Sequence, residues 1–134
     1  MTQSKKDLLL KDLCSRLPYK VKVQINDEIV VLDSICDDDG YHFNFIGDNK
    51  EGVNISDIKP YLRPMSSMTD EDHAIYSKIW EDAGKSAYLV GSHHLISTIK
   101  AYKVATDYLL SKHYDVSGLI PIGLAIDATN LNIY

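Results

Sequence analysis

The sequence has 134 residues, of which 45% are hydrophobic and 25% are charged. This composition is typical of one globular domain and atypical of a disordered chain, and no apolar run approaches the roughly 20 residues that a membrane-spanning helix needs. A net charge of −5 weighs against a nucleic-acid-binding function, because affinity for the phosphate backbone depends on clustered lysine and arginine.

The first segment is predicted to be an amphipathic helix. Ser4 and Asp7 have the spacing of a helix-capping pattern, and Pro18 ends the helix. Its apolar face is expected to hold Leu10, Leu13, Cys14 and Leu17. Acidic residues interrupt the N-terminal leucines, which makes the segment a poor secretory signal, so we expect a cytoplasmic protein. Neither Cys14 nor Cys36 belongs to a CxxC pair, and we expect both to be reduced and buried.

Residues 19–55 are typical of short strands joined by tight turns. Val21, Val23 and Ile25 alternate with polar residues, as in a strand with one wet face. Residues 28–36 are rich in Ile and Val and predict a second strand that is buried more continuously than the first. The Asp39-Gly40 step indicates a hairpin turn. A third strand is predicted over 41–45, and Val53 with Ile55 indicates a short fourth strand.

Two prolines, Pro60 and Pro64, make residues 55–72 a rigid, irregular boundary. Ser56-Asp57-Ile58 suits a 3₁₀ turn, and a fifth strand is plausible over 61–63. This order of elements resembles a small bent barrel of the SH3-like or Sm-like kind. An open, twisted antiparallel sheet with the first helix across one face fits the same pattern.

Beyond Pro64 the apolar period becomes helical. Thr69 is predicted to cap a helix that Gly84 ends, with an apolar stripe at Ile75, Ile79, Trp80 and Ala83. Ser92 is predicted to cap a longer helix with one face formed by Leu95, Ile99, Tyr102, Thr106 and Leu109. Because both helices are amphipathic, the apolar face of each needs a surface to pack against. Residues 118–134 are either a short helix and a turn or an extended return to the sheet, and the polar end 130–134 could be loose.

The predicted fold class is therefore α+β. Residues 1–64 are expected to form a helix and a small β unit, and residues 65–134 a helical part that packs on it in one compact domain.

Sequence motifs that would identify an enzyme are absent: there is no Walker loop, GxGxxG, GxSxG or HExxH. This favours a non-enzymatic protein, and we expect no cofactor. Asp37-Asp38-Asp39 could hold a cation, but a solvated hairpin tip is favoured because the spaced ligands of a calcium loop are lacking. Weak candidates for a metal or acid–base site are His73, His93 and His94.

Aromatic residues in the β half suggest a binding surface. Phe43 and Phe45 are expected in the core, with the tyrosines at its margin. Tyr61, held between Pro60 and Pro64, is the tyrosine that we expect to be partly exposed and rigid. The candidate binding residues are Tyr19, Tyr41, Tyr61 and Arg63.

Three segments carry a resemblance to known proteins. They are KDLCSRLPY at residues 11–19, DIKPYLRPMSSMT at 57–69 and GLIPIGLAIDAT at 118–129. They resemble short uncharacterised proteins of gut Bacteroides-type bacteria and their phages or mobile elements. The resemblance implies a bacterial or phage origin and an intracellular setting, and it brings no activity or catalytic residues.

Three functions remain open. The first is a protein-interaction module, for example a phage accessory or host-defence-modulating protein, whose acidic surface meets a basic partner. The second is a nucleic-acid-binding Sm-like or SH3-like unit. The third is a small metal-dependent or hydrolytic enzyme that uses the histidines. We favour the first, with an unknown protein partner and no membrane.

Overall fold

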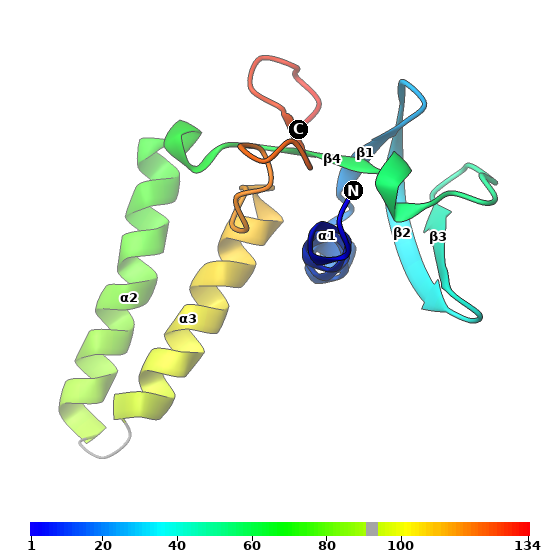
Figure 1. Ribbon diagram of the computed structural model, residues 1–134. Coiled ribbons are helices and arrows are strands. Elements are labelled where there is room, and N and C mark those ends of the chain that lie inside the picture. The colour runs from blue at the N-terminus through cyan, green and yellow to red at the C-terminus, as the bar shows by residue number, and fades with distance from the viewer. Residues whose placement is uncertain (91–93) are drawn as a thin grey trace.

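The structure is a computed structural model that describes the backbone of residues 1–90 and 94–134 and the side chains of 1–82 and 99–134. It is an α+β fold in which a first helix and an open five-stranded sheet are followed by two long helices (Figure 1). No helix within the described residues is long and apolar enough to cross a membrane. The elements are α1 (Gln3–Arg16), η1 (Leu17–Tyr19), β1 (Lys22–Ile25), β2 (Glu28–Asp37), β3 (Tyr41–Phe45), η2 (Ile55–Asp57), β4 (Lys59–Leu62), η3 (Met65–Ser67), α2 (Asp70–Val90), α3 (His94–Ser111) and β5 (Ile126–Asp127).

Helix α1 begins earlier than the sequence pattern predicts. Its N-cap is Thr2, whose hydroxyl accepts a hydrogen bond from the Lys5 amide at 3.3 Å, so the predicted Ser4 cap is wrong. The helix ends at Arg16, just before the turn that contains Pro18, as predicted. Leu9 and Leu13 are fully buried, whereas Cys14 is exposed. The buried face of α1 is therefore turned away from Cys14. Cys36 is exposed as well, so the expectation that both cysteines are buried is wrong.

The sheet has the order β3-β2-β1-β4-β5. β1 pairs antiparallel with β2 and with β4, β2 pairs antiparallel with β3, and β5 pairs parallel with β4. The predicted hairpin turns are confirmed, because Asp39 and Gly40 both adopt positive φ, at 51° and 108°. β2 is less continuously buried than expected, since its ends face solvent and Ile29 is 50% exposed.

The fourth strand predicted near Val53 and Ile55 is wrong. Residues 49–54 form no strand, Gly52 adopts a left-handed φ of 67°, and the chain then enters η2, the expected 3₁₀ turn. The predicted fifth strand exists as β4. Without a strand beside β3 the sheet stays open, which confirms the open-sheet alternative over a closed barrel.

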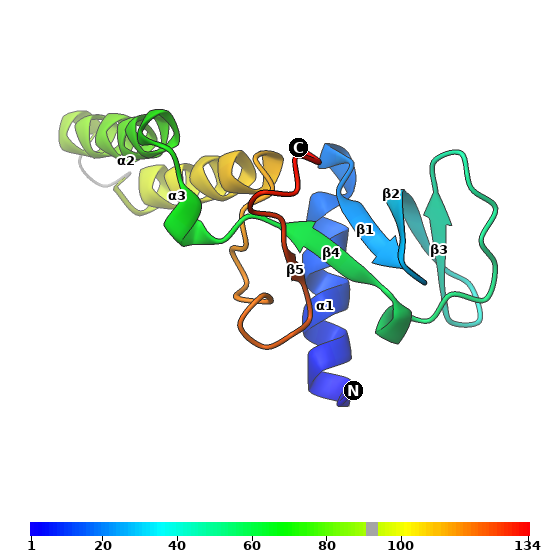
Figure 2. The same ribbon diagram turned by 90° about the horizontal axis from the view of Figure 1, so that it is seen from above.

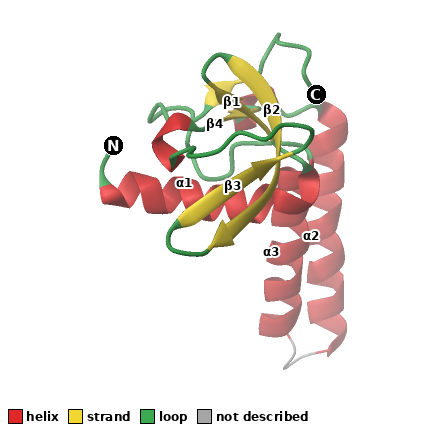
Figure 3. Cartoon of the chain, turned by 90° about the vertical axis from the view of Figure 1, so that its right-hand side faces the viewer, coloured by secondary structure: helices red, strands yellow, loops and turns green. Residues whose placement is uncertain are grey.

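The core lies between α1 and the concave face of the sheet. Val21, Val23 and Ile25 in and just before β1, the two phenylalanines of β3 and the buried leucines of α1 belong to this core. Figure 3 shows α1 running across one face of the sheet. Every second residue of β1 is buried, so the alternation read from the sequence of this strand is confirmed. The fully or nearly buried members include Leu9, Leu13, Val21, Val23, Ile25, Leu32, Phe43, Phe45, Ile58, Leu62 and Leu119.

Helices α2 and α3 form a long antiparallel hairpin, called the arm below, that extends away from the sheet (Figures 1 and 3). The Thr69 hydroxyl accepts from the Asp72 amide at 3.1 Å, which confirms the predicted cap. Gly84 does not end α2, which continues to Val90, because a single helical glycine weakens a helix without interrupting its hydrogen bonds. The predicted cap Ser92 lies outside the described residues.

The tail returns to the sheet as the extended segment β5, one of the two predicted conformations. Its last residues are held in place. The Tyr134 hydroxyl donates to the Tyr61 carbonyl at 2.9 Å, and the Tyr134 ring stacks on His113 with centroids 3.7 Å apart.

Candidate peptide-binding edge

Strand β3 ends the sheet order, so one side of its backbone has no neighbouring strand within the described chain. Among the residues that the structure describes, the one isolated bridge of β3 joins Phe45 to Asp48 at the end of the strand. An edge strand with unpaired N–H and C=O groups is a template for another extended chain. Because the expected fourth strand does not form, the backbone N–H and C=O groups on this side of β3 are, apart from this bridge, left unpaired in the described part of the chain.

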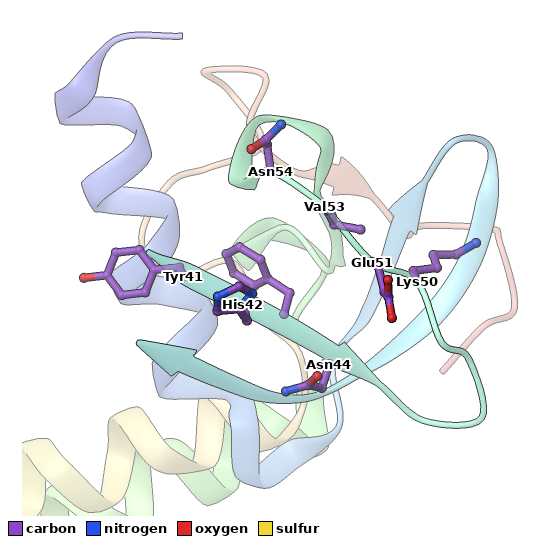
Figure 4. Close-up of a pocket in the computed structure, with 9 residues that line it drawn as sticks. Tyr41, His42, Asn44, Lys50, Glu51, Val53 and Asn54 are labelled. Atoms are coloured by element: carbon purple, nitrogen blue, oxygen red, sulfur yellow. The ribbon is translucent and has the colours of Figure 1, made fainter. Parts of the chain in front are cut away.

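A cavity of about 520 Å³ separates the free side of β3 from the segment that was expected to pair with it. We call it the edge slot. Figure 4 shows Tyr41, His42 and Asn44 on β3, opposite Lys50, Glu51 and Val53. The slot is lined by Tyr41, His42, Phe43, Asn44, Lys50, Glu51, Gly52, Val53 and Asn54.

The two faces of β3 give the edge slot an apolar and a polar side. Phe43 is 5% exposed and joins the core, whereas Tyr41 is 52% exposed. On the polar side, the His42 Nε2 lies 2.7 Å from the Asp38 carbonyl oxygen, and Asn44 Nδ2 donates to Ser34 Oγ at 3.1 Å. These contacts are made within the β2–β3 hairpin, so they fix the side chains without using the free backbone edge.

The edge slot lies in a strongly acidic part of the molecule. Residues 28–57, called the acidic lobe below, contain eight carboxylates and a single base, Lys50, for a net charge of −7 against −5 for the whole chain. The Lys50 Nζ lies 2.6 Å from Glu28 Oε2 and 3.4 Å from Asp48 Oδ2. The hydrogen bond that Lys50 donates to Glu28 raises the pKa of Lys50, and the Asp48 carboxylate adds to this effect. Six exposed carboxylates remain without a base in the lobe: Asp33, Asp37, Asp38, Asp39, Glu51 and Asp57.

The candidate binding residues named from the sequence are not brought together. Tyr41 lines the edge slot, but two strands separate it from Tyr61 of β4. Tyr61 is 5% exposed, so the expectation that it is partly exposed is wrong. β4 is an inner strand between β1 and β5, and this position buries the ring that the flanking prolines were expected to present.

Tyr19 lies in η1, and Arg63 directly follows β4. Partial burial and the Asp107 carboxylate raise the pKa of Tyr19. Arg63 lines a small polar cavity of about 190 Å³ with Ser67, Thr129 and Tyr134. The Arg63 backbone extends the sheet towards the arm, because its amide donates to the His113 carbonyl and its carbonyl accepts from the Asp115 amide, both at 2.8 Å.

Sequence reasoning missed the role of Tyr134. Its hydroxyl accepts from the Lys22 amide at 2.9 Å and donates to the Tyr61 carbonyl at 2.9 Å, so it bridges β1 and β4 where these strands separate. The Lys22 Nζ also donates to the Ile133 carbonyl. Burial raises the pKa of Tyr134 to about 12 and lowers that of the stacked His113 to about 4, so both rings are uncharged at neutral pH. No local pattern predicts a pairing across 112 positions.

A buried ion pair joins α1 to the base of the arm. The Arg16 Nε donates to Asp12 Oδ2 at 2.7 Å, and both side chains are fully buried. A second Arg16 nitrogen donates to the Tyr114 carbonyl at 2.8 Å, and the Ser117 hydroxyl donates to Asp12 at 2.8 Å. This joint uses residues that the amphipathic pattern of α1 did not mark as buried.

Inside the arm, Asp72 receives two tyrosine hydroxyls. Tyr108 donates to Oδ1 at 2.6 Å and Tyr114 to Oδ2 at 2.5 Å. The hydrogen bond from Tyr108, followed by that from Tyr114, lowers the pKa of Asp72. The same carboxylate raises the pKa of Tyr108 to about 12. These contacts fix α2 to α3.

The histidine hypothesis is not supported by the part of the chain that the structure describes. His73 is exposed, and within the described side chains no group of three or more His, Cys, Asp or Glu residues could hold a metal ion. His93 and the side chain of His94 lie outside the described residues. Asp37-Asp38-Asp39 forms an exposed hairpin end, as predicted.

Comparisons with known proteins give no family for this chain. No protein-family model matches it, and neither a curated protein nor a solved structure gave a match. The functional proposal below therefore depends on the geometry and charge of the molecule itself.

Proposed function

We propose that this protein is a non-enzymatic interaction module that binds an extended, basic segment of a partner protein by adding it as a strand at the β3 edge. A protein-interaction module of bacterial or phage origin, for example an accessory protein, is also the function that the sequence favours. The observation that carries the proposal is the free edge of β3 facing a cavity of about 520 Å³ within a lobe of net charge −7.

An extended chain suits the edge slot because it satisfies the free backbone groups of β3. Main-chain hydrogen bonds supply affinity in strand addition, and pockets for alternate side chains supply specificity. The partner strand would turn one set of side chains towards Phe43 and Val53 and the other towards His42 and Asn44. We therefore expect a segment in which apolar residues alternate with Lys or Arg.

The charge of the acidic lobe selects a basic partner. Its only base is already paired with Glu28 and Asp48, and its six other carboxylates are exposed. Complementary charge speeds encounter and suppresses binding of acidic chains, and the effect falls with added salt. The same charge disfavours a nucleic acid at this edge, because its phosphates would meet carboxylates.

The proposal is tested with a short fluorescein-labelled peptide of alternating Lys and Val, measured by fluorescence anisotropy. We expect saturable binding that weakens with salt. Two control peptides separate backbone pairing from charge: one is N-methylated at alternate residues, which removes strand-pairing N–H donors at constant charge, and one carries Glu in place of Lys. Equal binding of the N-methylated peptide would exclude strand addition, and absence of binding by the Lys–Val peptide would contradict the proposal.

A charge variant tests the site on the protein. Asp37→Asn, Asp38→Asn and Asp39→Asn together remove three carboxylates, and Asn tolerates the positive φ of residue 39. At 0.2–1 kcal/mol for each exposed ion pair, the peptide should bind about tenfold more weakly. The matched control, Glu71→Gln with Glu81→Gln and Asp82→Asn, removes three exposed charges from α2 and should leave affinity within about twofold. An equal loss in both variants would mean that only net charge matters.

A further inference from the structure

The arm presents an apolar face that the rest of the chain does not cover. Ile99 is 60% exposed and Tyr102 is 65% exposed, and both lie on the helical face that the sequence predicts to be apolar. On α2, Tyr76 and Trp80 are half-buried and meet edge to face, with ring centroids 6.4 Å apart. These four residues are called the arm face below.

Contacts between the two helices explain why this face stays open. Ala101 and Ala105 are buried on the side of α3 that meets α2, and Tyr108 reaches Asp72 on the same side. Ile99 and Tyr102 lie on another side of the helix, because successive helical residues turn by about 100°. α3 therefore packs on α2 through Ala101, Ala105 and Tyr108, while Ile99 and Tyr102 stay exposed.

The body of the protein covers only the base of this face. A groove of about 480 Å³ runs between α1 and the arm, where Tyr76 and Tyr102 face Leu8 and Lys11 of α1. Figures 1 and 2 show that α1 lies beside the end of α3 nearest the sheet, while the rest of the arm extends away from it. The arm face thus continues from a groove into an uncovered surface.

The two helices of the arm differ in charge. α2 carries five acids, of which Asp72 is buried inside the arm, and two lysines, whereas residues 94–112 carry three lysines and one acid, Asp107. A two-fold axis parallel to the helices would set α2 of one copy against α3 of the other, which brings the acidic helix to the basic one. The acidic lobe, which would repel its copy, lies at the opposite end of the molecule (Figure 1).

The available area is enough for a weak dimer. At 1.5 Å per residue and about 10 Å per helix, one side of the whole arm is about 27 Å long and about 20 Å wide, which gives at most roughly 500 Å² per copy, or about 1,000 Å² in total. That value is near the lower bound of specific interfaces, and tyrosine and tryptophan are the residue types that anchor them.

We propose that the arm face is a self-association surface on which the arm of a second copy packs, α2 against α3, to form a four-helix bundle. This proposal is independent of peptide binding at β3. The bundle would bury Ile99, Tyr102 and Trp80 together.

Sedimentation equilibrium on the full chain tests this, with self-association expected in the micromolar range. Tyr102→Glu should weaken the dimer at least tenfold by placing a charge in the interface. Val104→Glu is the matched control, because Val104 is 54% exposed and lies on the opposite side of α3, and it should weaken the dimer less than twofold. A wild-type monomer at all concentrations, or equal effects of the two variants, would overturn the proposal.

A charge exchange tests the orientation of the two arms. Lys103→Glu makes α3 more acidic, and Glu81→Lys makes α2 more basic, so each variant alone should dimerise severalfold more weakly than the wild type. Mixing the two should restore association, because each altered helix then meets its complement. Unchanged dimerisation of either variant alone would contradict the packing of α2 against α3. Circular dichroism of each variant establishes that the fold is retained.

Discussion

The β3 edge and the arm face are both incomplete surfaces, but they lack different things. At β3 the missing partner is a backbone, since N–H and C=O groups have a direction and only an extended chain satisfies them. Along the arm the missing element is apolar contact area. Burial of Ile99 and Tyr102 by any apolar surface is favourable, whatever the direction of its backbone. The comparison shows how one small chain can keep two binding surfaces distinct in chemistry as well as in position.

A joint of buried polar residues connects the arm to the body of the protein, which carries the β3 edge. Asp12 and Arg16 connect α1 to the Tyr114 carbonyl at the base of the arm. Asp72 fastens α2 to α3, and Tyr134 fastens β1 to β4. The single tryptophan, Trp80, lies in α2 and reports on the arm alone. Variants in these three contacts can therefore show whether the arm and the sheet unfold together or separately.

The largest effect is expected from the joint. Asp12→Ala leaves the Arg16 guanidinium buried without its carboxylate, so the free energy of unfolding should fall by about 3–5 kcal/mol. Urea unfolding followed by Trp80 fluorescence and by circular dichroism should show both signals moving together. Asp7→Ala, at an exposed position of the same helix, is the control and should change stability by less than about 0.5 kcal/mol. A loss confined to the fluorescence signal would show that the arm folds independently of the joint.

The second effect concerns the arm and its dependence on pH. Asp72→Ala leaves two tyrosine hydroxyls without their acceptor and should cost about 2–3 kcal/mol, with the Trp80 transition affected most. Because the folded-state pKa of Asp72 is lowered, its contribution is present above the unfolded pKa of about 3.9 and is lost as the pH falls through the folded value.

The raised pKa of Tyr108 has the opposite sign. Its contribution is present below the unfolded pKa of about 10 and is lost as the pH rises towards the folded value of about 12. Stability measured against pH should therefore fall at both extremes in the wild type and less steeply in Asp72→Ala. Parallel pH profiles for the two proteins would show that this carboxylate does not control the arm.

The smallest effect concerns the sheet. Tyr134→Phe keeps the ring on His113 but removes the hydroxyl that bridges Lys22 and Tyr61, and it should cost about 1–2 kcal/mol. Hydrogen exchange at the Lys22 amide should become faster, while Trp80 fluorescence should be unchanged. Tyr41→Phe is the control, because Tyr41 is exposed at the sheet edge. An unchanged exchange rate in Tyr134→Phe would mean that the bridge does not hold the two strands.

The parts of the fold that could be predicted depend on neighbours in sequence. The alternation of Val21, Val23 and Ile25 and the Asp39-Gly40 turn were sufficient to predict β1 and the β2–β3 hairpin, because both are set by local backbone preferences. Gly84 misled the prediction of α2, because contact with α3 over its length compensates for a weak helix former.

For the candidate site, the sequence indicated Tyr41 and the acidic turn but not the open edge. Val53 and Ile55 were read as a strand, and the edge slot exists because that strand does not form. Tyr61 was expected outside and is buried, since β5 arrives from far along the chain and makes β4 an inner strand.

By itself the sequence determined the α+β class, most strands and turns, the helix cap at Thr69 and the concentration of negative charge in residues 28–57. These follow from local periodicity, side-chain capping and composition. Only the tertiary structure decided that the sheet stays open, that Tyr134 joins β1 to β4 and that Ile99 and Tyr102 of α3 are left exposed. Each of these depends on which distant segments meet, and the long-range contacts that select a partner leave no periodic signal in the chain.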